Sequence, residues 1–446
     1  MDIVIAGAGD VGFHLSRWLS GESHNITLID RDDGKLSYVD SHIDAITIIG
    51  DVTDFRILQQ AKVQSADLFI SVTSYEDVNI TSAIYAKKMG ARQTIARISN
   101  MQYLIDSDIL NIRDLGIDEL ISPESLAARE VRHLLRTNAA SESIDFENGK
   151  ITLLGLDIED DAEVVGKSMA EIAQLSPERK YVVVALIRKD ETIIPKGHTK
   201  VEVGDHLFVI THAEGMEDVL AVTGKRKIKI KNIIVLGGSR TGTHLARKLS
   251  RHYHVKLIEK DAKRAEAMAA EFPNVMVLNF DGTEVETLVE EGVAETDAFV
   301  AVTGNSETNI LTCLVAKEKG AKKTIAMVEN IDYLSLSQAI GIDSLINKKL
   351  AAANFIYRYI RRGDIITLST LHGVNAEVME FLVHEKSRIT KHPIKDLGLP
   401  EGSIIGGVVR DNKGLIPTGD FHIHAGDRVV VFASNNCSHK MDKFFR

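Results

Sequence analysis

The sequence is poor in residues that cross-link, stiffen or anchor a chain. Its 446 residues include two cysteines, seven prolines, one tryptophan and only 5% aromatic residues. Cys313 and Cys437 provide neither a disulfide framework nor a metal-binding cluster, and this scarcity fits a reducing cytosol. No apolar run approaches the ~20 residues of a membrane-spanning helix. Because an expected strand begins at residue 2, we also expect no secretory signal.

Basic residues are outnumbered by acidic ones. The chain has 53 Lys and Arg residues against 63 Asp and Glu residues, a formal net charge of −10. A general nucleic-acid binder needs a positive field, so this balance argues against that class. The one dense basic run, residues 225–231 (KRKIKIK), favours a solvated linker over a membrane-surface or nucleic-acid patch. An apolar content of 44% fits compact α/β domains with short loops.

The most informative stretch is a glycine-rich turn near the start, residues 2–12 (DIVIAGAGDVG). The apolar run at residues 3–6 predicts a buried parallel strand. Gly7, Gly9 and Gly12 follow it in the spacing G-x-G-x-x-G. In this motif the first glycine makes the turn, the second lets backbone approach a pyrophosphate, and the third lets the helix pack on the strand. The stretch therefore predicts a nucleotide-binding turn.

Polar residues at the ends of successive expected strands strengthen this prediction. Asp30 ends the run ITLID about 20 residues after the turn, where a carboxylate can accept hydrogen bonds from ribose hydroxyls. The ends of later strands carry Asp51, Thr73, Ser74 and Arg97. We expect Asp51 near the adenine and Arg97 near phosphate. Each residue alone favours a cap or a surface ion pair, whereas the set favours contact with a ligand.

The same unit occurs twice. Residues 2–20 align with residues 232–250, and the correspondence continues as far as Tyr103 and Tyr333. Its period of roughly 225 residues is too long for a solenoid and indicates a tandem duplication of a domain pair. The second copy has Gly237, Gly242, Glu259, Asp281 and Thr303 where the first has Gly7, Gly12, Asp30, Asp51 and Thr73.

The second copy departs from the first at the phosphate end. Ser239 replaces the glycine of closest phosphate approach, Met327 stands where the first copy has Arg97, and Arg240 adds a positive charge. We therefore hypothesise that the two sites prefer different nucleotides.

The fold class expected is α/β, with two Rossmann-like doubly wound parallel-sheet domains, each followed by a small α+β domain. In the first half, strands are expected at 2–6, 26–29, 45–49, 67–72, 94–98 and 117–121, with helices between them, for example at 78–89 and 101–110. The expected segments are nucleotide domain one at 1–122, a connecting helix at 123–143, small domain one at 144–224, a linker at 225–231, nucleotide domain two at 232–347, a second connecting helix at 348–363 and small domain two at 364–446.

No pattern for catalysis accompanies these sites. The small domains show no His–carboxylate pair, nucleophile motif or metal-ligand spacing that can be read from the sequence, and the phosphate-transfer loop G-x-x-x-x-G-K-[ST] is absent. We predict no catalytic residue and no metal site. Two nucleotide sites, each followed by a second domain, favour a sensor in which a ligand shifts a conformational equilibrium. The alternative is an NAD-dependent oxidoreductase with duplicated Rossmann domains.

Several motifs carry a family resemblance. GAGDVG with Asp30, TIARI at 94–98 and the segment EGSIIGGVVRDNKGLIPTGDFHIHAGDRVVVF at 401–432 resemble the RCK (KTN) family of potassium-channel regulators. The tandem arrangement is similar to the double-length members of that family, which are cytosolic regulatory subunits of bacterial potassium uptake systems. The resemblance covers essentially the whole chain.

This resemblance implies a function and an assembly. Each large domain would be an RCK N-terminal nucleotide-binding domain and each small one an RCK C-terminal domain. The chain would form a homotetrameric ring beneath a dimeric TrkH-type potassium channel, at the inner face of the bacterial membrane. It would bind NAD(H), ATP and ADP and gate the channel. The regulatory subunit of another cation transporter is a further alternative.

The resemblance also assigns two sets of site residues. Site one comprises Gly7, Ala8, Gly9, Asp10, Val11, Asp30, Asp51, Thr73 and Arg97, and site two comprises Gly237, Ser239, Arg240, Thr241, Glu259, Asp281 and Thr303. Many single-repeat relatives have arginine where this chain has Asp10, and an acidic side chain there would repel a γ-phosphate. Asp30 and Glu259 would repel a 2′-phosphate, so NAD, ATP or ADP is expected rather than NADP.

Overall fold

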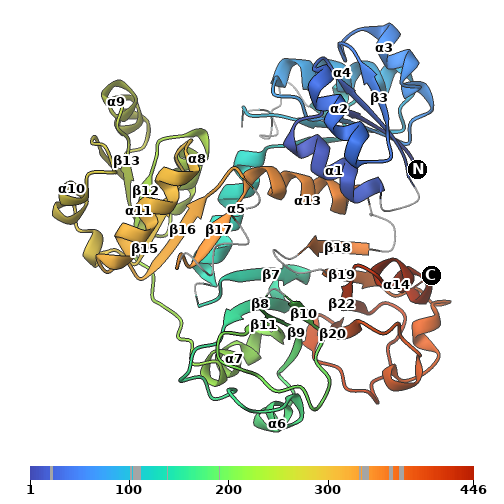
Figure 1. Cartoon of the computed structure of the whole chain (residues 1–446), viewed down its shortest axis with the longest axis vertical. Helices are drawn as coiled ribbons and strands as arrows, with labels where there is room; N and C mark the ends of the chain where they lie inside the picture. Colours follow the sequence, from blue (N-terminus) through green and yellow to red (C-terminus); the bar gives the residue numbers. More distant parts are fainter. Residues whose placement is uncertain are drawn as a thin grey trace. The chain divides into compact units, whose positions relative to one another are not determined.

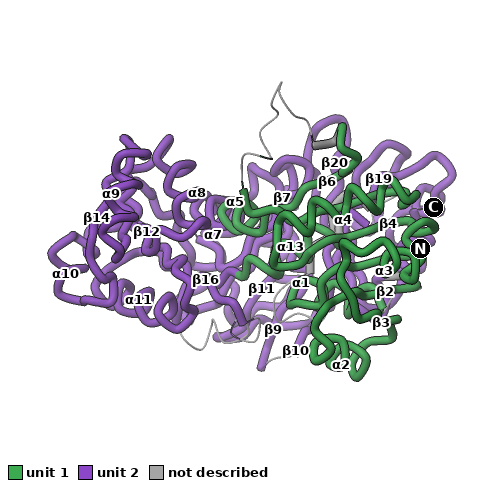
Figure 2. The backbone as a smooth tube through the Cα atoms, turned by 90° about the horizontal axis from the view of Figure 1, so that it is seen from above, with its two compact units in different colours: residues 1–129, 347–357 green, residues 130–346, 358–446 purple. Residues whose placement is uncertain are grey.

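The structure, a computed structural model, describes residues 1–20, 24–100, 103, 112–137, 139–189, 191–330, 333, 341–360, 365–370 and 376–445. Its contacts divide the chain into two compact units, residues 1–129 with 347–357 and residues 130–346 with 358–446 (Figure 2). No helix among the described residues is long and apolar enough to cross a membrane. The helix expected at 101–110 lies outside the described residues, apart from residue 103.

The first unit contains a six-stranded parallel sheet in the order β3-β2-β1-β4-β5-β6 (Figure 1). The strands are β1 (Asp2–Ala6), β2 (Asn25–Asp30), β3 (Ile46–Ile49), β4 (Leu68–Ser71), β5 (Gln93–Arg97) and β6 (Glu119–Ile121). All six strands expected in this half are present, each within two residues of its predicted ends. The strand order reverses between β1 and β4, which is the switch point where doubly wound folds bind ligands.

Helices separate these strands in sequence. They are α1 (Asp10–Ser20), α2 (Asp33–His42), α3 (Phe55–Gln60), α4 (Glu76–Met89) and α5 (Pro123–Arg136), with short 3₁₀ turns η1 (Val63–Ser65) and η3 (Ile112–Leu115). The apolar run of β1 is buried from Ile3 to Ala6, as a parallel strand covered on both faces requires. Gly90, at φ +124°, ends α4 in a conformation that favours glycine.

The second unit repeats this sheet in the equivalent order β14-β13-β12-β15-β16-β17. Its strands are β12 (Asn232–Leu236), β13 (His254–Ile258), β14 (Val275–Leu278), β15 (Ala298–Ala301), β16 (Lys323–Met327) and β17 (Ser344–Ile346). Its helices are α8 (Arg240–Leu249), α9 (Ala262–Glu271), α10 (Val285–Glu290), α11 (Ser306–Glu318) and the turn η6 (Val293–Glu295). The predicted pair of Rossmann-like domains is confirmed.

Each nucleotide domain is followed by a small, mainly antiparallel sheet. The first has the order β10-β9-β11-β8-β7 and the second β18-β19-β22-β20-β21. Their strands are β7 (Glu142–Phe146), β8 (Ile151–Asp157), β9 (Tyr181–Arg188), β10 (Glu191–Ile193) and β11 (His206–His212), then β18 (Ile365–Thr370), β19 (Ala376–Leu382), β20 (Ser403–Arg410), β21 (Lys413–Leu415) and β22 (Arg428–Ser434). The helices are α6 (Met169–Leu175), α7 (Met216–Val222) and α14 (Ser438–Phe445), with the turns η4 (Glu147–Gly149), η5 (Ala213–Gly215), η8 (Arg388–Thr390) and η9 (Ile394–Asp396).

The two small domains pack together through a shared hydrophobic cluster. Phe146 and Phe208 of the first domain cluster with Val378 and Phe432 of the second, all fully buried. A Cβ on Gly406 would lie 2.2 Å from the Ile210 side chain, so glycine permits this close approach. The sequence predicted the two α+β domains but did not indicate that they pack against each other.

Helix α13 (Lys348–Ile360) follows β17 directly in sequence. Its residues 348–357, with Asn347 before them, nevertheless belong to the first unit, where α13 lies beside α1 (Figures 1 and 2). The ring of Tyr357 contacts the chain's only tryptophan, Trp18, at a centroid distance of 5.7 Å. A helix from the second half of the sequence therefore packs on the first nucleotide domain.

Candidate nucleotide-binding sites

The three glycines of the first turn meet different surroundings. Gly7 has φ +107°, and a Cβ on it would lie 2.9 Å from the backbone nitrogen of Thr73. A Cβ on Gly12 would lie 1.9 Å from the Gly7 carbonyl oxygen. A Cβ on Gly9 would have no atom within 4 Å. Packing within the protein therefore requires glycine at the first and third positions, whereas the second leaves open space above the turn.

This open space lies at the start of α1. The helix begins at Asp10, and its first turn closes with a hydrogen bond from the Phe13 N–H to the Gly9 carbonyl, 2.8 Å. The first N–H groups of a helix have no partner within the helix and carry partial positive charge. A phosphate fits this position because these groups can donate hydrogen bonds to it.

Asp30 is held against the same turn. Its Oδ2 accepts a hydrogen bond from the Ala8 N–H at 2.7 Å, and its Oδ1 accepts one from the Asp32 N–H at 3.0 Å. Each carboxylate oxygen keeps a further lone pair. The side chain is thus fixed next to the glycine turn and can still accept from two ribose hydroxyls.

Asp51 is more fully engaged. Its Oδ1 accepts hydrogen bonds from the backbone N–H and the hydroxyl of Thr53, at 2.9 and 2.8 Å, while its Oδ2 pairs with Arg31. The Thr53 backbone hydrogen bond is the largest influence, and with the Thr53 hydroxyl and Arg31 it lowers the pKa of Asp51 against a smaller desolvation effect. Asp51 therefore caps its own turn and forms an ion pair. Its contact with adenine stays a prediction.

Asn79 fixes the wall of the crevice opposite β1. It is 1% exposed, and its Oδ1 accepts from the N–H and hydroxyl of Thr73 at 2.8 and 2.7 Å. Its Nδ2 donates to the carbonyl oxygens of Thr73 and Arg97 at 3.1 and 3.0 Å. One amide thus joins the ends of β4 and β5. Thr73 and the partly exposed Arg97 lie where the sequence predicted, and Ser74 is exposed beside them.

Asn309 stands at the same position of the second copy and makes the same set of hydrogen bonds. Its Oδ1 accepts from the N–H and hydroxyl of Thr303 at 2.9 and 2.6 Å, and its Nδ2 donates to the Thr303 and Met327 carbonyls at 3.2 and 2.7 Å. The amide donates to the backbone carbonyl of residue 97 or 327 and does not depend on the side chain there. Methionine in place of arginine therefore leaves this hydrogen bond intact.

The second turn keeps its two packing glycines. Gly237 has φ +104° and would place a Cβ 2.9 Å from the Thr303 nitrogen, and a Cβ on Gly242 would lie 1.9 Å from the Gly237 carbonyl oxygen. Ser239 occupies the middle position. Its hydroxyl donates to the Val302 carbonyl at 2.7 Å and accepts from the Gly242 N–H at 3.2 Å, so it caps α8. The Ser239 side chain therefore occupies the position that is open beside Gly9 in the first turn.

Glu259 is more deeply buried beside its turn than Asp30 is beside the first turn. It is 6% exposed, accepts from the N–H groups of Gly238 at 3.1 Å and Asp261 at 2.9 Å, and lies 3.5 Å from Arg264. Arg264 also donates to the Gly238 carbonyl. A Cβ on Gly238 would lie 2.6 Å from both the Glu259 carboxylate and the Met268 methyl carbon. The sequence analysis overlooked Arg264 and Met268, whose distance along the chain gives no local signal.

The remaining predicted residues of site two lie around this turn. Arg240 is the first residue of α8, and Thr241 beside it is buried. Asp281 accepts from the N–H and hydroxyl of Thr283 at 3.1 and 2.9 Å, and the backbone hydrogen bond is the main cause that lowers its pKa. Asp281 thus caps its turn as Asp51 does.

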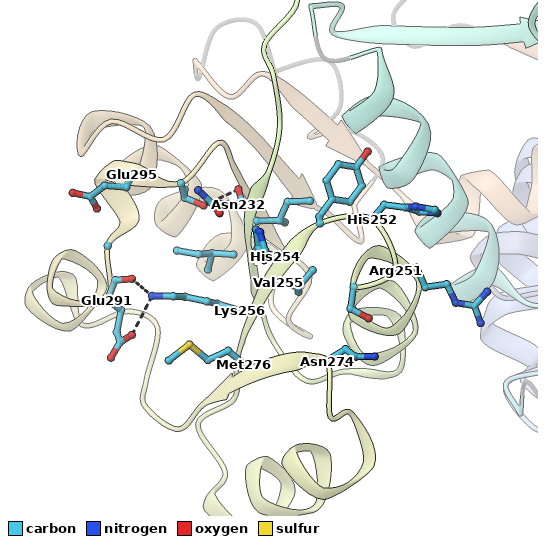
Figure 3. Close-up of a pocket in the computed structure, with 16 residues that line it drawn as sticks. Asn232, Arg251, His252, His254, Val255, Lys256, Asn274, Met276, Glu291 and Glu295 are labelled. Atoms are coloured by element: carbon cyan, nitrogen blue, oxygen red, sulfur yellow. Dashed lines mark hydrogen bonds and ion pairs between the residues drawn. The ribbon is translucent and has the colours of Figure 1, made fainter.

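A separate pocket lies at the other edge of the second sheet (Figure 3). It is lined by the amino-terminal ends of β12, β13 and β14, including Asn232, His254 and Met276. Lys256 projects across it to the backbone carbonyl of Glu291, at 2.6 Å. Because parallel strands begin at one edge and end at the other, this pocket is distinct from the glycine-turn crevice.

Family models match nearly the whole chain. The TrkA-N domain model matches residues 3–123 and 233–348, and the TrkA-C domain model matches residues 153–224 and 378–446. Among solved structures, the GsuK channel bound to NAD is 15% identical with a TM-score of 0.59, over 100% of this chain and 78% of that one. The GsuK RCK domain also has a TM-score of 0.59, with 94% of that chain covered. These likenesses show a shared fold.

Curated relatives extend the match over the full length. Trk system potassium uptake protein TrkA homolog 1 of Methanosarcina mazei is 34% identical, with 100% of both chains covered. Trk system potassium uptake protein TrkA of Haemophilus influenzae is 30% identical, covering 98% of this chain and 96% of that one. The chain therefore belongs to the TrkA family of potassium uptake proteins, with two TrkA-N and two TrkA-C domains in tandem.

Proposed function

We propose that this chain is a non-enzymatic, nucleotide-sensing regulatory subunit that gates a TrkH-type potassium channel. The observation that carries the proposal is the open space above Gly9, at the start of α1 and beside the fixed carboxylate of Asp30. A glycine that the protein's own packing does not need, placed where a phosphate fits, favours a ligand at that position. The names of the full-length relatives favour potassium uptake as the process regulated.

The ligands proposed are NAD(H), ATP and ADP. All share an adenosine and a diphosphate, so they can use the same ribose carboxylate and the same helix start. NADP is disfavoured because Asp30 and Glu259 would repel its 2′-phosphate. Solved structures of the similarly folded GsuK channel carry NAD in one case and ADP in another, which supports this ligand class.

The parts of each site have different proposed tasks. Asp30 and Glu259 accept from ribose hydroxyls, the starts of α1 and α8 bind phosphate, and Asn79 and Asn309 hold the crevice walls. A bound nucleotide supplies charge and shape rather than chemistry. A nucleotide that binds one conformation more tightly shifts the population towards it, and this shift is what gates the partner.

We further propose that four copies form a ring at the cytoplasmic face of the membrane, attached through the TrkH-type partner. The seven-segment division of the chain into nucleotide domains, connecting helices, linker and small domains is part of this proposal. In that division each nucleotide domain acts on its small domain through a connecting helix.

The test is potassium flux through the TrkH-type partner in proteoliposomes, with the chain and NADH, ATP or ADP on its side. We expect flux to change with the nucleotide, and Asp30→Ala and Glu259→Ala each to remove part of the response. Asp33→Ala, an exposed charge change at the start of α2, serves as the control. Flux that ignores every nucleotide would contradict the proposal, and turnover of NADH with a small substrate would favour an oxidoreductase instead.

A further inference from the structure

A lysine from the second half of the sequence lies at the first glycine turn. Nζ of Lys349 is 2.5 Å from Oδ2 of Asp10, although 339 residues separate them along the chain. Asp10 is the first residue of α1, the helix whose start is the proposed phosphate site. The lysine side chain is 24% exposed and the aspartate 59%, so the ion pair lies at the edge of the open space.

Helix α13 is held so that this lysine stays in place. Asn347, 2% exposed, accepts hydrogen bonds from the N–H groups of Lys349 and Leu350, both at 2.9 Å, and thereby caps the helix. Tyr357 and Trp18 make ring contact eight residues beyond Lys349 and Asp10, respectively. At 1.5 Å per residue, the two contacts are about 12 Å apart on each helix. The helices therefore run side by side in the same direction, with both starts at the glycine turn.

The corresponding positions of the other copies carry the opposite charges. α5 begins at Pro123 and α13 at Lys348, so Glu124 corresponds to Lys349, and the glycine turns align Arg240 with Asp10. The aligned positions of the repeat therefore carry reversed charges, because Asp10 aligns with Arg240 and Lys349 aligns with Glu124. The second turn carries a cation itself, whereas the cation paired with the first turn comes from α13.

We propose that Lys349 is a phosphate-binding residue of site one, supplied by a helix from the second half of the chain. Without a nucleotide, its ammonium group neutralises Asp10. With a nucleoside diphosphate at the start of α1, the flexible lysine stem lets the ammonium group contact phosphate, which offsets the repulsion from Asp10. A nucleotide at site one then contacts α13 directly, through Lys349. This inference rests on the proposed function and gives site one a second positive charge, in addition to the predicted Arg97.

The test is calorimetric titration of the full chain with ADP and with adenosine, for wild type, Lys349→Met and Lys349→Arg. A hydrogen bond to a charged group predicts that Lys349→Met weakens ADP binding about tenfold to a hundredfold. Adenosine, which has no phosphate, should bind both proteins equally, and Lys349→Arg should keep most of the ADP affinity. Titration in the Glu259→Ala background isolates site one. Equal ADP affinity of Lys349→Met and wild type would overturn the inference.

A second background separates phosphate contact from simple neutralisation of Asp10. In Asp10→Asn, the acidic repulsion is gone, and the Lys349→Met change should still weaken ADP binding about tenfold if lysine contacts phosphate. If the change has no effect in that background, Lys349 serves only as the counter-ion of Asp10 and the proposal fails.

Two controls make the result interpretable. Lys88→Met, an exposed charge change at the far end of α4, should leave ADP binding unchanged. Fluorescence of Trp18, which contacts Tyr357, should be the same in ligand-free wild type and Lys349→Met if α13 remains docked. Absence of ADP binding in the wild type would contradict the proposed function itself, whereas binding that ignores Lys349 contradicts only this inference.

Discussion

The two nucleotide domains agree at the adenosine end of the crevice and differ at the phosphate end. Both keep an acidic residue hydrogen-bonded to the glycine turn, through Asp30 and Glu259. Both join two strand ends through a buried asparagine amide. At the phosphate end, the open space at Gly9 contrasts with the capping hydroxyl of Ser239. Between the two copies, the residues that fix the crevice are kept, whereas the residues at the proposed phosphate end differ.

The contact between the glycine turn and its acidic residue involves two positions that differ together between the domains. The first turn has Ala8 with the shorter Asp30, and the second has Gly238 with the longer Glu259. A Cβ at Gly238 would lie 2.6 Å from the Glu259 carboxylate, so the longer acid requires the smaller turn residue. The residue at the turn and the acid that contacts it therefore have to be considered as a pair in each site.

The largest expected effect tests what both turns share. Gly12→Ala or Gly242→Ala places a methyl group 1.9 Å from a backbone carbonyl oxygen, and we expect a loss of about 3 kcal/mol or more in unfolding free energy. Urea denaturation measures it. Gly9→Ala is the matched control in the same turn, with open space around the new methyl group, and should change stability by less than about 0.5 kcal/mol while weakening nucleotide binding. Equal destabilisation by Gly9→Ala and Gly12→Ala would contradict the account of the turn.

A buried lysine distinguishes the two domains in its pH response. Lys323 is buried, with its Nζ donating to the Ala140 carbonyl at 2.8 Å, and burial lowers its pKa from 10.5 to about 8. The corresponding residue of the first domain, Gln93, is exposed. Between pH 8 and 10.5 the unfolded state binds more protons, so this group's contribution to stability rises with pH, by roughly 3 kcal/mol in total.

Denaturation at several pH values, for wild type and Lys323→Gln, checks this prediction. The unfolding free energy of wild type minus that of Lys323→Gln should increase as pH rises from 8 to 10.5. Below pH 7 this difference should stay constant. A constant difference across the whole range would show that Lys323 has an ordinary pKa.

The hydrogen bonds of Asn79 and Asn309 should contribute equally to the stability of the two domains. Asn79→Ala or Asn309→Ala leaves the N–H of a crevice threonine and two strand-end carbonyls without their amide partner, and we expect a cost of about 2 to 3 kcal/mol in each case. Hydrogen exchange of the residues around Thr73 and Thr303 would show which domain loosens. Strongly unequal losses of unfolding free energy would mean that Asn79 and Asn309 differ in role despite their matching hydrogen bonds.

A smaller effect tests the compensating pair. Gly238→Ala should cost about 1 to 2 kcal/mol because its methyl group meets Glu259 and Met268. The double variant Gly238→Ala with Glu259→Asp reproduces the first domain's combination and should recover the part of the loss that comes from Glu259, while the contact with Met268 remains. Thermal unfolding of the single and double variants measures the coupling. If the double variant is as unstable as the sum of the two single ones, the residues do not compensate.

Much of this architecture could be predicted because it depends on local pattern. The apolar run of β1, the glycine spacing and the repeat located both sheets, and the conformations of Gly7 and Gly237 required glycine as expected. The strand order follows from the rules for alternating strands and helices. Asp30 and Glu259 could be predicted because their distance from the turn is set by one strand–helix–strand unit.

The rest depends on contacts between distant segments, which periodicity does not encode. Lys349 contacts Asp10 across 339 residues, and the two small domains pack together through a shared cluster, with Gly406 close to Ile210. Arg264 reaches the second turn from α9. The Asp51 carboxylate has the position predicted from the sequence, but the sequence did not indicate its capping and ion-pair partners.

The central claim, two unequal adenine-nucleotide sites on one chain, is tested most directly by calorimetric titration with NADH, NAD, ATP, ADP and NADPH, repeated on Asp30→Ala and Glu259→Ala. We predict two sites per wild-type chain with different nucleotide preferences, no binding of NADPH, and the loss of one class of site in each variant. Two identical sites would contradict the inequality. No binding of any nucleotide to the wild type would mean that the glycine turns serve packing alone and would contradict the sensor itself.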